Sequence, residues 1–236
     1  MGLPKIDVPV YNTELPSTGE LIKFRPFLVK EQKQLLIAQG GDAQQQYEAV
    51  QDIVRACTYD KFNVAAAPAY DVEYLFLQIR ARSVGENIDL VLTCGECENK
   101  QNQVLDITTV RINKPDNHKS SIDLGNGLNL NLKDPTLQQL EAFKVNAQTG
   151  DGADAIIGLV ASCITNIWRG DENFAAADYS PAEMVEFVEN LSPQNLERLE
   201  GYFATMPSLR HSIEFKCEKC GADNSADMEG LQSFFV

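Results

Sequence analysis

The sequence predicts an α+β protein that is mainly helical, and two observations lead to this fold class. Apolar residues recur at helical spacing in several segments of the 236-residue chain. In addition, two cysteine pairs, Cys94-Gly-Glu-Cys97 and Cys217-Glu-Lys-Cys220, each lie between two strand-like runs. A strand, a CxxC turn and a second strand are the outline of a zinc knuckle, and two knuckles supply the four thiolates of a tetrahedral site. We therefore expect a zinc-ribbon-like β module formed by two knuckles that are distant in the sequence.

The N-terminal part of the chain is predicted to be an extended arm followed by helices. Residues 1–28 are rich in Pro, Thr, Ser and Gly and end in a strand-like run. This predicts an extended arm, which is either disordered or laid against a neighbour, and a strand that follows it. Residues 29–86 are predicted to form a helical segment. Its helices are expected at 29–38, 43–57 and 70–82, and in the last two the apolar residues fall at i, i+3, i+4 and i+7.

Most of the predicted strands lie in or beside the two knuckles. Residues 208–236 are expected to form the second zinc knuckle, which packs with the first. Its apolar end, 231–236, is either the last strand of the knuckle or a tail that docks into a partner. Residues 87–134 are expected to hold the first knuckle, with strands near 87–93 and 103–110, and a further hairpin in which a strand near 110–114 pairs with one near 127–133.

Between the knuckles, residues 135–207 are predicted to be an inserted helical bundle. Its first helix opens at Asp134-Pro-Thr, where Asp can cap the helix and Pro suits the first helical position. The most apolar helix is expected to carry a stripe from Ile156 to Ile167 and to end at Trp168. The last two helices open at Ser180-Pro and Ser192-Pro.

The predicted metal ligands are Cys94, Cys97, Cys217 and Cys220, which would hold a structural Zn²⁺. Four thiolates leave no open coordination position, so the metal would stabilise the fold rather than catalyse a reaction. Its binding would contribute roughly 10 kcal/mol or more to folding. A redox pair of the thioredoxin kind would open a helix, and neither pair does so. Unmetallated or disulfide-bonded pairs and a redox role stay open as alternatives.

The other cysteines and the histidines favour structural roles. Cys57 and Cys163 lie on apolar helix faces, as small buried residues do. His118 lies in a polar turn and His211 precedes Cys217, and either could serve as a ligand in a variant site. The chain has no Gly-rich phosphate loop, no HExxH and no GxSxG motif. The sequence therefore predicts that the protein is not an enzyme and has no catalytic residue.

The composition argues against nucleic-acid and membrane partners. The formal net charge is −14 and no cluster of Lys or Arg occurs, whereas nucleic-acid-binding proteins carry basic patches. No stretch approaches eighteen apolar residues, the length of a membrane span. The N-terminus lacks the apolar region of a signal peptide, and Ile6 breaks the myristoylation pattern that begins at Gly2. We expect a protein kept in a reducing cytoplasm, where paired cysteines more often bind metals than form disulfides.

Two runs near the N-terminus, Leu-Pro-Ser-Thr-Gly at 15–19 and Phe-Arg-Pro-Phe-Leu-Val-Lys-Glu at 24–31, carry a family resemblance. The segment that contains them, 11–36, resembles the baseplate hub proteins of T4-like contractile-tailed phages. The resemblance extends to Phe215-Lys-Cys217-x-x-Cys220 and covers most of the chain.

The resemblance implies a non-enzymatic structural or assembly protein of the phage tail baseplate hub. Its partners would be other hub and tail proteins, with no nucleic acid and no membrane, and an oligomer within the baseplate is compatible with this role. It would be made in the host bacterial cytoplasm, with a place in the virion tail baseplate. The arm could order on a partner by burying Phe24, Phe27 and Leu28. The main alternative is a zinc-ribbon adaptor that binds proteins outside any virion, and a weaker one is a nucleic-acid-binding zinc ribbon.

Overall fold

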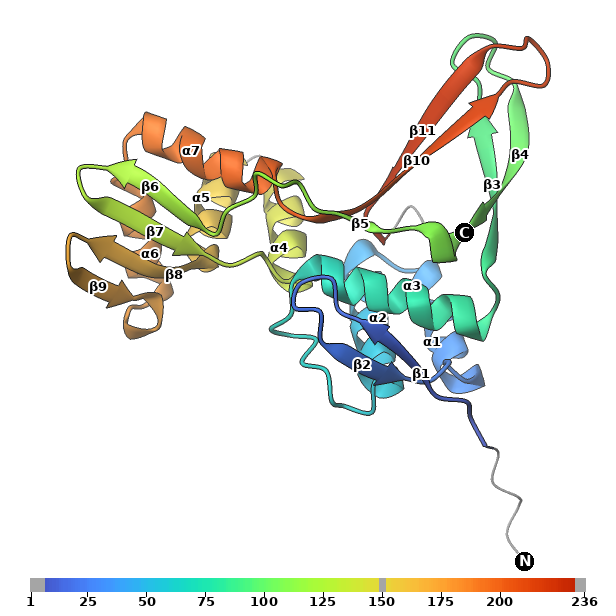
Figure 1. Cartoon of the computed structure of the whole chain (residues 1–236), viewed down its shortest axis with the longest axis horizontal. Coiled ribbons are helices and arrows are strands. Elements are labelled where there is room, and N and C mark those ends of the chain that lie inside the picture. Colours follow the sequence, from blue (N-terminus) through green and yellow to red (C-terminus); the bar gives the residue numbers. More distant parts are fainter. Residues whose placement is uncertain (1–6, 149–151, 232–236) are drawn as a thin grey trace, which may run out of the picture. The chain divides into compact units, whose positions relative to one another are not determined.

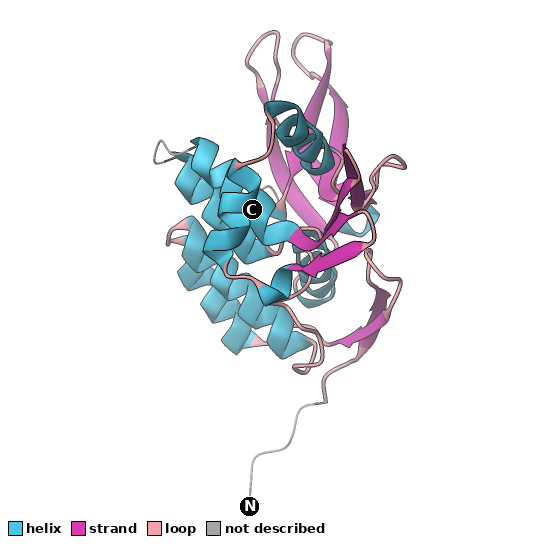
Figure 2. Ribbon diagram, turned by 90° about the vertical axis from the view of Figure 1, so that its left-hand side faces the viewer, coloured by secondary structure: helices cyan, strands magenta, loops and turns pink. Residues whose placement is uncertain are grey.

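The computed structural model describes residues 7–148 and 152–231. Helices make up 42% and strands 28% of these residues, so the fold is α+β but not mainly helical as predicted. Helices and strands both recur along the chain, and Figure 2 distinguishes the two by colour. The chain divides into two compact units. Unit 1 comprises Met1–Val64, Tyr70–Asn113 and Ser208–Val236, and unit 2 comprises Ala65–Ala69 and Lys114–Pro207.

Unit 1 begins with a β-hairpin and three helices. Strands β1 (Tyr11–Glu14) and β2 (Leu21–Phe24) pair in antiparallel fashion. The helices are α1 (Val29–Gln39), α2 (Ala43–Cys57) and α3 (Ala69–Ser83), which confirms the three helices predicted in this region (Figure 1).

The expectation that Phe24 and Phe27 are buried on a partner is wrong. Both are buried within their own chain, with 2% and 7% of their surface exposed. The reason is the turn after β1, where the Gly19 amide donates to the Leu15 carbonyl and Gly19 adopts φ +73°. This turn folds β2 back on β1, and glycine reaches positive φ without a steric penalty. Residues 1–6 of the predicted arm lie outside the described residues.

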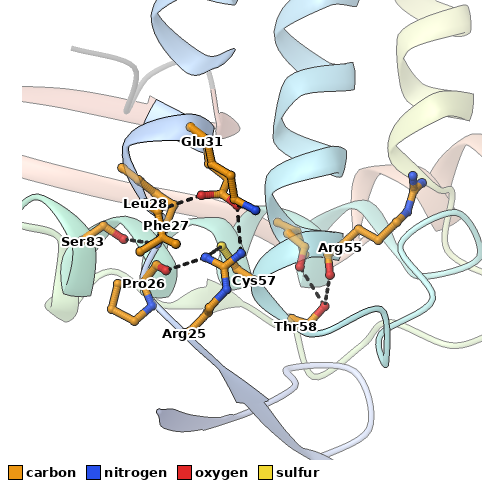
Figure 3. A network of polar contacts seen from close by, with 11 residues as sticks. Arg25, Pro26, Phe27, Leu28, Glu31, Arg55, Cys57, Thr58 and Ser83 are labelled. Carbon is orange, nitrogen blue, oxygen red and sulfur yellow. Dashed lines mark hydrogen bonds and ion pairs between the residues drawn. The ribbon is translucent and has the colours of Figure 1, made fainter. Parts of the chain in front are cut away.

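A buried polar network joins the hairpin to α1 and α2 (Figure 3). The Arg25 guanidinium donates to Glu31 Oε1 at 2.8 Å and to the Pro26 carbonyl at 2.9 Å, and lies 3.7 Å from Cys57 Sγ. The other oxygen of Glu31 accepts from the Leu28 amide at the start of α1. Burial raises the pKa of Glu31, but the hydrogen bonds from Arg25 and Leu28 outweigh it and leave the pKa lowered.

Two further hairpins form the β module of unit 1. Strand β3 (Asn87–Thr93) pairs with β4 (Lys100–Asp106), and β10 (Ser208–Lys216) pairs with β11 (Asp223–Glu229). The short strand β5 (Ile112–Asn113) pairs with the start of β10. One apolar cluster joins both hairpins to α3. It contains Leu77, Ala81, Ile88, Leu90, Leu105, Ile107, Val110, Leu209 and Met228.

Unit 2 is a four-stranded antiparallel sheet, in the order β6-β7-β8-β9, packed with four helices. Its core includes the buried residues Leu130, Val160, Ile164 and Leu199. The elements are β6 (Ser121–Gly125), β7 (Leu128–Leu132), α4 (Leu137–Gln148), α5 (Gly152–Cys163), β8 (Ile164–Arg169), β9 (Glu172–Ala175), α6 (Pro181–Glu189) and α7 (Pro193–Ala204). Ser180 and Ser192 cap α6 and α7 as predicted, each accepting a hydrogen bond from an amide three residues later.

Two predictions about strands and helices are wrong. The apolar helix ends at Cys163, and Ile164–Arg169 is strand β8 because it pairs with β7 on one side and β9 on the other. The strand predicted near 127–133 pairs with β6 and β8, whereas the strand at 112–113 pairs with β10. At the C-terminus Leu231 is buried and its amide donates to Glu73, but the strand or tail predicted for 232–236 lies outside the described residues.

No helix among residues 7–148 and 152–231 is both long enough and apolar enough to cross a membrane.

Replacing Glu31 by Gln should destabilise unit 1 by about 3 kcal/mol, because it leaves the Arg25 charge buried without its partner. Urea unfolding of wild type and variant measures this difference. The matched control is Glu183→Gln, at the exposed capping box of α6. This control substitution should lower the free energy of unfolding much less. Since the folded pKa of Glu31 is lowered, its stabilising contribution is present above the unfolded pKa of about 4.3 and is lost as the pH falls through the folded value. If wild type exceeds the Glu31→Gln variant in free energy of unfolding by the same amount at pH 7 and at pH 3, this role of Glu31 is contradicted.

Candidate metal centre

The first knuckle is a tight turn between β3 and β4. The Cys94 amide donates to the Asn99 carbonyl at 2.9 Å, and the Glu98 amide donates to the Cys94 carbonyl at 3.0 Å. Glu98 has φ 56°, a left-handed conformation that is uncommon for a residue with a side chain. The turn therefore brings Cys94 and Cys97 to the end of the hairpin, and both the amide and the carbonyl of Cys94 are hydrogen-bonded within it.

The second knuckle repeats this geometry between β10 and β11. The Cys217 amide donates to the Ala222 carbonyl at 2.8 Å, and the Gly221 amide donates to the Cys217 carbonyl at 2.9 Å. Gly221 occupies the position of Glu98 in the first turn and has φ 76°. Each first cysteine directly follows its strand, and the returning strand starts six residues after it. The two knuckles are thus equivalent in backbone hydrogen bonding as well as in sequence pattern.

The four cysteine sulfurs converge from the two knuckles. Cys94 Sγ lies 3.7 Å from Cys220 Sγ, and Cys97 Sγ lies 3.6 Å from Cys217 Sγ. All four sulfurs lie within 4.8 Å of one another. A tetrahedral Zn(Cys)4 centre with Zn–S bonds of about 2.3 Å has sulfurs about 3.8 Å apart, whereas a disulfide bond is about 2.05 Å long. The cluster therefore fits a tetrahedral metal ion, and all four cysteines are free.

The pKa values of Cys94, Cys217 and Cys220 are displaced, and not all in the same direction. The backbone amide of Cys97 lowers the pKa of Cys94 to about 6, and the backbone amide of Cys220 lowers that of Cys217. A backbone hydrogen bond from Ala222 also lowers the pKa of Cys220, but the neighbouring thiols of Cys97 and Cys217 raise it to about 12 overall. The contacts among the thiols thus favour the thiolate at Cys94 and Cys217 and disfavour it at Cys220. A bound cation would favour the thiolate form throughout the cluster.

Two polar residues that the sequence did not single out hold the knuckles together. Gln101 is buried; its Nε2 donates to the Lys216 carbonyl at 3.1 Å and its Oε1 accepts from the Glu218 amide at 3.0 Å. Asn224 accepts from the Gly95 amide at 2.9 Å, and its Nδ2 lies 3.5 Å from Cys94 Sγ.

Gln101 and Asn224 occupy equivalent positions. Each stands seven residues after the first cysteine of its own knuckle, and each accepts from the amide that follows the first cysteine of the other knuckle. The equal spacing is the one sequence signal that could have identified them. Because both side chains cross from one hairpin to the other, they position the cysteines independently of any metal.

The remaining cysteines and the histidines have other surroundings. Cys57 and Cys163 are buried as predicted, and burial raises the pKa of each thiol to about 11. His211 lies on β10, and His118 bonds to Asp134 and Thr205 in unit 2. Among the described residues, the sulfur cluster includes no histidine.

Replacing Gln101 or Asn224 by Ala should weaken Zn²⁺ binding about tenfold to a hundredfold, the usual effect of removing a side chain that orients metal ligands. Competition between the protein and a chromophoric chelator measures the affinity. The control is Asn102→Ala, because Asn102 is the exposed neighbour of Gln101 on β4. Unchanged Zn²⁺ affinity in the Gln101→Ala and Asn224→Ala variants would show that the turns alone position the sulfurs.

Comparison with known proteins identifies the family. Neither the curated protein sequences nor the solved structures gave a match. A family model described as T4 bacteriophage base plate protein matches residues 8–236, which includes both knuckles and nearly the whole chain. This agrees with the resemblance carried by residues 11–36. The chain therefore belongs to the T4 bacteriophage base plate protein family.

Proposed function

We propose that this chain is a structural or assembly protein of the baseplate hub, which acts through protein–protein contacts and carries a structural Zn²⁺. The observation that carries the proposal is the family match, because it extends over both units rather than over the cysteine motifs alone. Membership of a baseplate protein family supports a non-enzymatic role, other tail and baseplate proteins as partners, and a place in the virion tail. Assembly would start in the host bacterial cytoplasm.

The proposed metal is Zn²⁺, bound by Cys94, Cys97, Cys217 and Cys220. Zn²⁺ takes four thiolates in tetrahedral sites, and the two cross-knuckle distances of 3.7 and 3.6 Å suit that geometry. Four protein ligands leave no position for a substrate or a water, so the ion would stabilise the fold. Its effect would be to lock the ends of two hairpins into one rigid module, which suits a protein that must present fixed surfaces to neighbouring subunits.

Purified protein should contain about one zinc per chain, as a single Zn(Cys)4 site requires. Elemental analysis measures the content, and X-ray absorption should show sulfur neighbours at about 2.3 Å. The double variant Cys217→Ser/Cys220→Ser should lose the zinc and unfold at lower temperature. The matched control is Cys57→Ala/Cys163→Ala, which also removes two cysteines but should keep the zinc. Protein without metal and with disulfide-linked knuckles would refute the proposed metal site.

The assignment to the hub can be tested during infection by a phage that encodes this chain. The tagged full chain should recover proteins of the central hub in preference to proteins of the outer baseplate, as judged by quantitative mass spectrometry. The Cys217→Ser/Cys220→Ser variant should recover less of them, because its β module is no longer rigid. Comparison of assembling and mature tails then distinguishes a hub subunit from an assembly factor. Recovery of outer baseplate proteins alone would place the chain elsewhere in the baseplate.

A further inference from the structure

Helix α1 turns three of its four large apolar side chains outward, and the fourth, Leu35, is half-buried. Val29 is 81% exposed, Leu36 61% and Ile37 67%. The buried positions of the helix are instead Glu31 and Ala38. Residues that are seven or eight apart lie on the same side of a helix, so Val29, Leu36 and Ile37 form one face and the buried pair lies on the other. We call Val29, Lys30, Lys33, Leu36 and Ile37 the outer face of α1.

The outer face is positively charged as well as apolar. Lys33 lies between the apolar side chains on the helical wheel, is exposed, and makes no ion pair with the part of the chain that the structure describes. Lys30 keeps 72% of its side chain exposed, although its Nζ lies 3.4 Å from Glu31. Glu31 itself points inward to Arg25. A chain with a net charge of −14 thus exposes two lysines and no carboxylate on this face.

The charge of the outer face restricts what can cover it. Two copies that met through their α1 helices would place Lys30 and Lys33 against the same lysines, which is repulsive. The two terminal segments outside the described residues, 1–6 and 232–236, contain no Asp or Glu to neutralise the lysines. The complementary occupant is a helix with apolar side chains along one side and carboxylates beside them.

We propose that the outer face of α1 is a docking surface for an acidic amphipathic helix of another baseplate protein. The identity of the partner as a baseplate protein rests on the proposed function, whereas its chemistry rests on α1 alone. The contact would bury Val29, Leu36 and Ile37 against the partner's apolar stripe and place Lys30 and Lys33 beside its carboxylates. Apolar burial supplies most of the affinity in such helix contacts, and charge complementarity selects the partner.

The chemistry of the surface is tested with a synthetic probe and the full chain. The probe is an amphipathic peptide with Leu at i, i+3, i+4 and i+7 and Glu at the flanking positions, and its counterpart has Lys in place of Glu. Fluorescence anisotropy should show the Glu peptide binding at least about tenfold more tightly than the Lys peptide, with an affinity that falls as salt is added. Equal binding of the two peptides, or no binding of the Glu peptide, overturns the proposal.

Matched variants assign the binding to α1. Leu36→Ser/Ile37→Ser should weaken the binding of the Glu peptide by about tenfold or more. Lys33→Glu should remove the preference of the chain for the Glu peptide over the Lys peptide. The apolar control is Val91→Ser/Val104→Ser, because Val91 and Val104 are 64% and 63% exposed on β3 and β4. The charge control is Lys61→Glu, at an exposed loop residue of unit 1. A control variant that weakens binding as much as the α1 variants overturns the assignment.

The same variants identify the partner during infection. Carbodiimide treatment, which joins an amine to a carboxylate, should link Lys30 or Lys33 to Asp or Glu in an apolar helical segment of a baseplate protein, and Leu36→Ser/Ile37→Ser should abolish the link. If the wild-type chain recovers baseplate proteins without such a link, the docking surface is refuted while the proposed function stands. If it recovers no baseplate protein, the proposed function fails and the peptide measurement still decides the docking chemistry. A link to a second copy of this chain overturns the choice of partner.

Discussion

The meeting of the two knuckles is the constraint on which the rest of the structure depends. Cys94 and Cys220 are 126 positions apart in the sequence, yet their sulfurs are 3.7 Å apart. Closing so long a loop costs little extra when most of it is a folded unit with its own core, as unit 2 is. The chain leaves and re-enters unit 1 at Asn113 and Ser208, which are direct partners between β5 and β10. Inserting unit 2 at this point therefore does not pull the knuckles apart.

The β module of unit 1 is held at both ends by different forces. An isolated two-stranded hairpin is marginally stable at best. The module contains one such hairpin, β3-β4, and a second, β10-β11, which gains only the two-residue strand β5. Near α3, apolar residues of both hairpins share one cluster with Leu77 and Ala81. At the far end, where the strands turn (Figure 1), apolar residues give way to the four sulfurs and the crossing amides of Gln101 and Asn224. The cysteine cluster and the two side-chain amides thus join the hairpins at this end of the module.

Sequence reasoning succeeded where one local signal determined the structure. Helical spacing located α2 and α3, and the cysteine pairs identified residues that the fold brings within 4.8 Å. It failed where the structure of a segment depends on residues far away in the sequence. The run from Ile164 to Trp168 satisfies a helix pattern, but pairing with β7 and β9 makes it a strand. Gln101 and Asn224 look like ordinary polar strand residues, because the groups that they bond belong to the other knuckle.

The orientation of helix α1 could not be derived from the spacing of its apolar residues. The inward side of an ordinary amphipathic helix is apolar, yet the most buried residue of α1 is Glu31. Its carboxylate bonds Arg25 and the Leu28 amide at the helix's own N-cap. A buried ion pair is weak as a source of net stability but strongly penalises any arrangement that separates its partners. Turning α1 to bury Leu36 and Ile37 would break that pair and leave Arg25 uncompensated. The ion pair therefore keeps the apolar face of α1 on the outside, where it is available to a partner.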